Sequence, residues 1–425
     1  MSSSVSRPGT LALSEEETPL AETPRITVLG SGYAPEHGLE QLRGRHVLLL
    51  QGPAGPFFRR VSGHLRRRGC RITKVNFNSG DDLYYRGAEV VRFRGARDQW
   101  PAFLARLLDE RGIEAIVLFG DCRPLHRVAI EHGRASGRLV FVFEEGYLRP
   151  DFVTLEQNGV NGHSSIPRDP EFYRAIEPRP LPEPQPVRHG FASAMAHTIC
   201  YATVNALLAA RYPSYRHHRD IRPFHQAGLW LRGGVRRGLH TLRDRPIDRR
   251  LMARKLGAYF FVPLQVHLDS QMQHCQFETI EHFIEHVVAS FAHHAPPHTK
   301  ILLKHHPFDR AYRDYSALMA DLVRRHRLDD RLLYVDIINI PGTLRAALGP
   351  VVINSTVGLS SIHHGTPVKC LGTAVYDIPG LTHQGPLDTF WTAPGKVDRD
   401  LYERYRYYLR THNQINGSVW TDLCL

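Results

Sequence analysis

The chain has 425 residues, enough for two domains that each bury their own core. A formal net charge of +12 calls for an anionic partner or surface. The six cysteines form no CxxC pair, which favours a reducing cytosol over a disulfide framework or a zinc site. No apolar stretch has the flanks of a secretory signal, and the longest apolar run, 191–210, is too polar to span a membrane.

Residues 1–42 are polar, and we expect a weakly ordered leader there. A series of short apolar strands follows, separated by helical patterns that begin near residues 57, 100 and 124. The expected strands are 46–50, 72–77, 90–93, 115–119 and 139–143. This alternation predicts a parallel sheet covered by helices on both faces, forming a domain over 43–175.

The segment 176–256 is expected to be a linker with a helical, strongly basic part. Thirteen Lys and Arg lie between Arg211 and Lys255, against only three Asp. Such a stretch suits nucleic acid, an anionic bilayer, an anionic ligand or simply a solvated surface. No RNP, helix-turn-helix or zinc-finger signature accompanies the charge, so a nucleic-acid partner is not expected.

A second strand and helix series predicts another domain over 257–393, followed by a C-terminal helix and tail over 394–425. Its expected strands are 258–262, 301–303, 332–335, 351–353 and 368–371, and its clearest helix covers 280–291. The predicted fold class is therefore α/β, with two Rossmann-like domains facing each other across a cleft. In such sheets, ligands bind beyond the carboxyl ends of the strands.

Seven polar clusters follow predicted strands, and each one alone is equally compatible with a capped turn. They are Gln51-Gly52-Pro53, Asn76–Asp81, Gly120-Asp121-Cys122-Arg123, Glu144-Glu145-Gly146, Gln265–Asp269, Lys304-His305-His306-Pro307 and Asn354-Ser355-Thr356. Their shared position at one edge of each sheet indicates a site.

Two clusters suggest a phosphate-binding site. Asn354-Ser355-Thr356 enters a helix and suits either a phosphate or an ordinary N-cap. Lys304 and His306, before the strand-ending Pro307, suit neutralisation of a nucleotide phosphate.

The acidic residues have two interpretations each. Glu144 and Glu145 raise each other's pKa and suit a general base, or form a solvated acidic turn. Asp269 suits a nucleophile or a stabiliser of a positively charged, sugar-like transition state. The sequence contains no P-loop and no GxGxxG, which argues against a P-loop kinase and a dinucleotide enzyme. It also has no HExxH and no regular Cys/His spacing, so metal catalysis is not expected.

Several of these motifs resemble the capsule polysaccharide biosynthesis proteins of the KpsS/LipB type, over roughly residues 45–395. The matching segments are Leu49–Phe58, Val117–Pro124, Phe143–Pro150, Val262–Asp269, Lys304–Pro307 and Ile353–Leu359. The resemblance implies a GT-B-like, retaining β-Kdo transferase of Gram-negative bacteria (Kdo is 3-deoxy-D-manno-octulosonic acid). Such enzymes transfer Kdo from CMP-Kdo to lyso-phosphatidylglycerol to start the poly-Kdo linker of the capsule.

The resemblance also implies residue roles, without a metal or other cofactor. Glu145 is expected as general base and Asp269 as nucleophile, with retention by double displacement or by a front-face route. The donor phosphate is expected at Lys304, His306 and Pro307 and at Asn354, Ser355 and Thr356. The implied substrate-binding residues are Gln51, Gly52, Asp121, Arg123, Glu144, Gly146, Arg149 and Gln265.

The basic stretch is then expected to dock a cytoplasmic enzyme on the anionic inner membrane. The expected partners are a CMP-sugar, an anionic lipid acceptor and other capsule proteins, including a transferase that extends the Kdo linker. The competing function is a non-catalytic scaffolding or export subunit of the capsule machinery.

Overall fold

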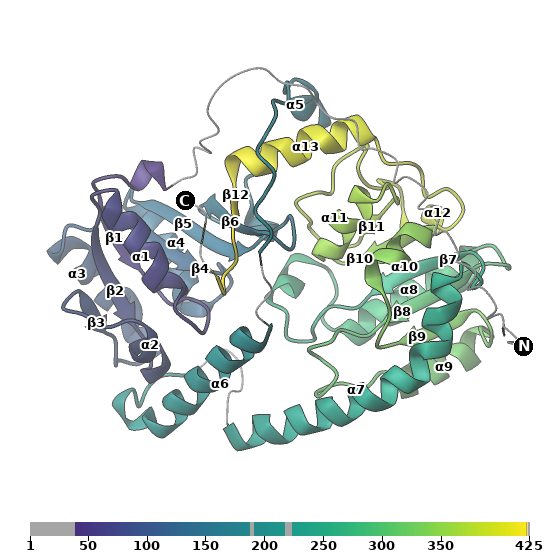
Figure 1. Ribbon diagram of the computed structural model, residues 1–425, viewed down its shortest axis with the longest axis horizontal. Helices are drawn as coiled ribbons and strands as arrows, with labels where there is room; N and C mark the ends of the chain where they lie inside the picture. The colour runs from purple at the N-terminus through teal and green to yellow at the C-terminus, as the bar shows by residue number, and fades with distance from the viewer. Residues whose placement is uncertain (1–38, 188–190, 217–222, 422, 424–425) are drawn as a thin grey trace, which may run out of the picture.

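The computed structural model describes residues 39–187, 191–216, 223–421 and 423 (Figure 1). Only the last four residues of the predicted leader, 1–42, fall within these ranges. Leu39 and Leu42 are buried in the N-terminal core, next to a short 3-10 helix, Glu40–Leu42. Residues 39–42 therefore belong to the first domain.

The N-terminal domain is built on a seven-stranded sheet with the order β12-β6-β5-β4-β1-β2-β3. Its strands are β1 (His46–Leu49), β2 (Arg71–Asn76), β3 (Val90–Arg92), β4 (Ala115–Phe119), β5 (Leu139–Glu145), β6 (Phe152–Gln157) and β12 (Gln414–Asn416). The first five are parallel, as the sequence predicts. β6 and β12 are antiparallel additions at one edge that the sequence does not predict.

Both faces of this sheet are covered, which explains its continuous apolar strands. The connecting helices are α1 (Phe57–Arg67), α2 (Ser79–Tyr84), α3 (Trp100–Glu110) and α4 (Pro124–Ala135). In and just after β1, Val47 and Leu49 pack into one core, and Leu48 and Leu50 pack into the other. A strand that is buried on both faces has no need of polar alternation.

The C-terminal domain has a five-stranded, wholly parallel sheet with the order β11-β10-β7-β8-β9. Its strands are β7 (Tyr259–Pro263), β8 (Lys300–Lys304), β9 (Leu332–Val335), β10 (Gly349–Val352) and β11 (Lys369–Cys370). Its helices are α8 (Ile280–His294), α9 (Ser316–His326), α10 (Ile340–Ala346), α11 (Thr356–His363) and α12 (Leu387–Phe390). Phe260 and Phe261 belong to cores on opposite faces.

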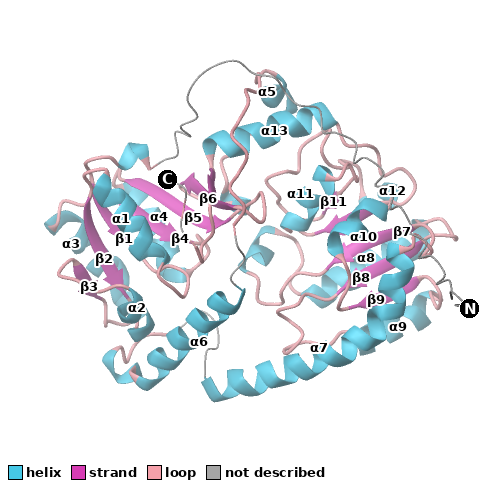
Figure 2. Ribbon diagram, in the orientation of Figure 1, coloured by secondary structure: helices cyan, strands magenta, loops and turns pink. Residues whose placement is uncertain are grey.

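The end of the chain returns to the first domain through α13 (Arg399–His412), which lies across the top of Figure 1. This helix packs against α5 (Pro170–Arg174) and leads into β12. Tyr173 and Tyr405 stack edge to face in a core shared by both domains. The two sheets, each flanked by helices in Figure 2, confirm the predicted pair of Rossmann-like domains in a GT-B-like arrangement.

The predicted linker contains two helices, and each packs against a different domain. The helix α6 (Phe191–Leu207) packs against α2 of the N-terminal domain. The helix α7 (Pro223–Met252) packs against α10 of the C-terminal domain, and both helices run along the lower edge of Figure 1. Among the described residues, no helix is both long enough and apolar enough to cross a bilayer.

Candidate active site

Glu144 and Glu145 are the last two residues of β5, so their side chains leave opposite faces of the strand. The Glu144 carboxylate is half-buried beside Gly120, where a Cβ would lie 3.6 Å from Oε2. Burial is the main cause that raises the pKa of Glu144 to about 7; the hydrogen bond from the Glu145 backbone amide opposes this rise, and the charges of Glu145 and Asp121 add to it. A carboxylate with this pKa is suited to accept a proton at neutral pH.

Glu145 has a different environment. It is exposed and forms an ion pair with Arg149 at 2.8 Å between Oε2 and a guanidinium nitrogen. Arg149 also donates to the Gly146 carbonyl at 3.3 Å. The sequence assigns the base to Glu145, and that assignment stays a prediction; burial and pKa favour its neighbour Glu144.

Only glycine fits at position 146, because β6 passes too close for a side chain. An alanine at this position is expected to lower the midpoint of thermal unfolding, because its Cβ would lie 2.1 Å from the Phe152 carbonyl oxygen. Forcing backbone apart in a packed region costs about 1–3 kcal/mol. The matched control is Gly238→Ala on the exposed surface of α7, where no atom lies within 4 Å of the added Cβ. Equal melting of the two variants would contradict this account.

The other predicted substrate-binding residues of the first domain make internal contacts. Gln51 is buried and donates to the hydroxyl of Tyr201 at 3.1 Å, which ties α6 to the sheet. The Gly52 carbonyl accepts a hydrogen bond from Arg123 at 3.1 Å. Asp121 is buried and accepts from the Val160 amide at 3.0 Å. These contacts shape the edge of the sheet, and direct substrate contact by these residues stays a prediction.

The last residue of β8 and the residues after it form a basic region in the second domain. Lys304 is buried, and its ammonium group donates to the His305 carbonyl at 3.1 Å. His306 accepts the Phe308 amide proton at Nδ1, which leaves its Nε2 to carry the proton of the neutral ring. Burial is the main cause that lowers the pKa of His306 to about 4, and Lys304, His305 and Arg149 also lower it. His306 is thus a neutral hydrogen-bond donor among cations at pH 7.

Arg149 connects the two domains at this point. It belongs to the first domain, pairs with Glu145, and lies near enough to His306 of the second domain to lower its pKa. The sequence predicts these residues separately, and the electrostatic effect of Arg149 on His306 shows that the structure brings the two motifs near each other.

Asp269, Gln265 and Asn354 form a hydrogen-bonded chain. The Gln265 amide donates to Asp269 Oδ2 at 3.3 Å and to Asn354 Oδ1 at 2.9 Å. The other Asp269 oxygen accepts the Gln271 amide at 3.0 Å and caps the 3-10 helix Ser270–His274. These contacts hold the loop after β7 in place and fix the orientation of the Asp269 carboxylate.

The residues before α11 form the N-cap that the sequence leaves as one of two alternatives. The Ser355 hydroxyl accepts the Val357 amide at 3.3 Å, and Thr356 is the first helical residue. Pro307 is exposed in the turn after β8. A cap of this kind also leaves amide groups at the helix N-terminus that suit an anion.

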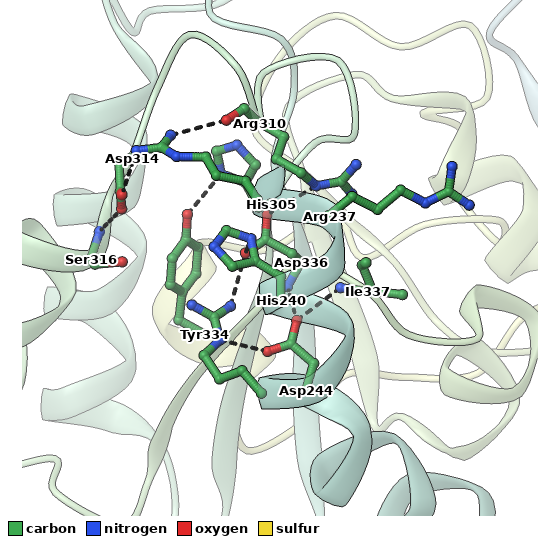
Figure 3. A network of polar contacts seen from close by, with 12 residues as sticks. Arg237, His240, Asp244, His305, Arg310, Asp314, Ser316, Tyr334, Asp336 and Ile337 are labelled. Atoms are coloured by element: carbon green, nitrogen blue, oxygen red, sulfur yellow. Dashed lines mark hydrogen bonds and ion pairs between the residues drawn. The ribbon is translucent and has the colours of Figure 1, made fainter. Parts of the chain in front are cut away.

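A buried charge network fixes α7 to the edge of this region (Figure 3). Asp336, which follows β9, contacts His240 and Arg243 of α7, both at 2.8 Å. Asp244 of α7 accepts the Asp336 amide at 2.6 Å. His305 lies in the same network, and its Nδ1 forms a hydrogen bond with the Tyr334 hydroxyl at 2.7 Å. The sequence gives no signal for this network, because its members are far apart along the chain.

Cys122, His163 and His274 form a further group that the sequence does not indicate. Their potential metal-ligand atoms all lie within 4.8 Å of one another. Cys122 and His274 are 152 positions apart, so no spacing pattern could reveal them.

Residues 114–420 match the family of capsule polysaccharide biosynthesis proteins, and the chain belongs to that family. It is 38% identical to the capsule polysaccharide export protein KpsS of Escherichia coli, over 88% of this chain and 97% of KpsS. It is 40% identical to the capsule polysaccharide modification protein LipB of Neisseria meningitidis, over 89% of this chain and 92% of LipB. The predicted resemblance to the KpsS/LipB type is therefore confirmed.

Among solved structures, the chain is similar to the β-Kdo 2,7-transferase of KpsC from Thermosulfurimonas dismutans. The identity is 14% and the TM-score 0.40, over 85% of this chain and 89% of the other. A superposition this loose assigns neither a substrate nor site residues.

Proposed function

We propose that this protein is a retaining β-Kdo glycosyltransferase that uses CMP-Kdo and starts the poly-Kdo linker on lyso-phosphatidylglycerol. The family and the relatives KpsS and LipB support a role in capsule polysaccharide assembly. The observation that carries the proposal is the junction at Arg149, where the acidic pair of one domain meets the basic region of the other. Transfer from a sugar nucleotide needs both a base for the acceptor and cations for the departing phosphate.

In this proposal each group has a defined role. Glu144 accepts the proton of the acceptor hydroxyl, and Arg149 and Lys304 attract the CMP phosphate. His306 donates a hydrogen bond from its Nε2–H group to a phosphate oxygen, while Ser355 and Thr356 offer a second phosphate contact. Asp269 is the candidate nucleophile, because Gln265 and the Gln271 amide hold its carboxylate in one orientation.

Binding of CMP tests the donor half of the proposal. His306→Ala is expected to weaken CMP binding about 10- to 100-fold, the usual loss for one hydrogen bond to a charged group. Titration calorimetry measures this change, and His282→Ala, at an exposed histidine of α8, is the control. An unchanged CMP affinity of the His306→Ala variant would contradict the proposal that the CMP phosphate binds at His306.

The exposed side of α7 supports peripheral docking on an anionic membrane. Val235, Leu239 and Leu242 are 57%, 60% and 69% exposed and lie on one stripe of the helix, at i, i+4 and i+7. Arg232, Arg237 and Arg245 are exposed on the same helix. An apolar stripe flanked by arginines suits the headgroup region of an anionic lipid bilayer.

The double variant Leu239→Ser/Leu242→Ser is therefore expected to bind phosphatidylglycerol vesicles about tenfold less well than the unchanged protein. Vesicle co-sedimentation at low salt measures the effect, with Leu348→Ser as a control at an exposed leucine just before β10. If the double variant and the control bind vesicles equally, docking through α7 is wrong. Once docked, the protein would work at the cytoplasmic face beside the transferase that extends the linker.

The alternative is a non-catalytic scaffolding or export subunit, which is favoured by the name of the KpsS relative, a capsule polysaccharide export protein. Such a subunit would keep its role after loss of Glu144 or Asp269, whereas an enzyme would not.

A further inference from the structure

We propose that Cys122, His163 and His274 bind one divalent zinc ion that joins the two domains. Cys122 follows β4, and His163 ends the short 3-10 helix Asn161–His163, both in the N-terminal domain. His274 ends the 3-10 helix Ser270–His274 of the C-terminal domain. This inference is independent of the proposed transferase activity.

The distances are close to those of a zinc site. Bond lengths of about 2.3 Å to sulfur and 2.0–2.1 Å to nitrogen place tetrahedral ligands about 3.5 Å apart. Cys122 Sγ lies 3.7 Å from His274 Nε2, and all three ligand atoms fall within 4.8 Å. Small side-chain movements would therefore close the site around an ion and leave a fourth position for water.

The surroundings also match those of bound metals. Buried Asp121 contacts His163 Nδ1 at 3.0 Å, which orients the ring and leaves its other nitrogen for a metal. The negative charges of Asp121 and of a Cys122 thiolate would balance the two positive charges of zinc. His163 is 50% exposed, which gives an ion a path from solvent.

Gly162 makes room for the third ligand. A Cβ at this position would lie 2.2 Å from the His274 ring, so any larger residue would displace it. The variant Gly162→Ala thus disturbs the site while all three ligands stay chemically intact.

Metal content of the untagged full-length protein tests the proposal, after removal of metal by a chelator and dialysis against Zn²⁺. The unchanged protein is expected to retain one more equivalent of zinc than Cys122→Ser, His274→Ala and Gly162→Ala. Cys275→Ser and His286→Ala are controls at a neighbouring cysteine and an exposed histidine, and should retain that equivalent. Equal zinc content in all variants would overturn the proposal.

Cobalt provides a second measurement that does not depend on whether a variant folds. With Co²⁺ in place of Zn²⁺, the unchanged protein should show the intense absorption of a tetrahedral site and a sulfur-to-cobalt charge-transfer band. A bound Co²⁺ without the thiolate band would place the metal at surface histidines and overturn the assignment.

Discussion

Glu144→Gln is expected to lower the rate of sugar transfer by about 10²- to 10⁴-fold, the usual contribution of a positioned general base. Glutamine keeps the size of the side chain but cannot accept the acceptor proton. The pKa of Glu144 is raised to about 7, chiefly by burial, and only the deprotonated form acts as base. The rate of the unchanged enzyme should therefore rise with pH up to about 7 and level off above it, and Glu144→Gln should lack this rise.

Glu145→Gln is the matched control, one residue away on the opposite face of β5. Its ion pair with Arg149 is half-exposed, and such pairs contribute about 0–1 kcal/mol. We expect a change of a few-fold at most in the transfer rate. If Glu145→Gln abolishes transfer while Glu144→Gln stays active, the base is Glu145, as the family resemblance implies.

Asp244→Ala is expected to destabilise the protein by about 3–5 kcal/mol, the usual cost of breaking a buried ion pair. Asp244 is 1% exposed and accepts the amides of Asp336 at 2.6 Å and Ile337 at 3.0 Å (Figure 3). It also pairs with Arg243 at 2.7 Å. Its removal leaves buried donors without an acceptor and loosens α7 from the C-terminal domain.

The control for this variant is Asp400→Ala on α13. Asp400 is 73% exposed and pairs with Arg404 at 2.7 Å, one helical turn away. Loss of such a surface pair should cost about 0–1 kcal/mol. Chemical denaturation followed by circular dichroism compares the two variants, and equal midpoints would show that the α7 network does not stabilise the fold.

The parallel strands could be predicted because they are buried on both faces and therefore uniformly apolar. β6 could not, because only one of its two buried faces is apolar: Val153 and Leu155 pack into the core, and the opposite face is polar. Thr154 and Glu156 are buried, and they hydrogen-bond Gln414 at 2.9 Å and Asn413 at 3.1 Å. Those partners lie more than 250 positions away, so hydropathy gives no signal for the strand or for the return of the chain through β12.

The position of the candidate site could be predicted because the carboxyl ends of parallel strands meet at one edge. The separation of roles within the acidic pair could not, since it depends on which face of β5 packs beside Gly120, Asp121 and Arg123 in the folded domain. The same limit applies to Gln265 and Asn354, whose amides bond each other. Only the folded structure shows that Gln265 and Asn354 form hydrogen bonds that stabilise the loop containing Asp269.

The most direct test of the proposed activity is incubation of the purified protein with CMP-Kdo and lyso-phosphatidylglycerol, followed by mass spectrometry of the lipid. We predict a lipid heavier by one Kdo residue, or by several if the enzyme adds more than one, together with released CMP. Folded protein that leaves both the lipid and CMP-Kdo unchanged would contradict the proposed transferase and favour the scaffolding role.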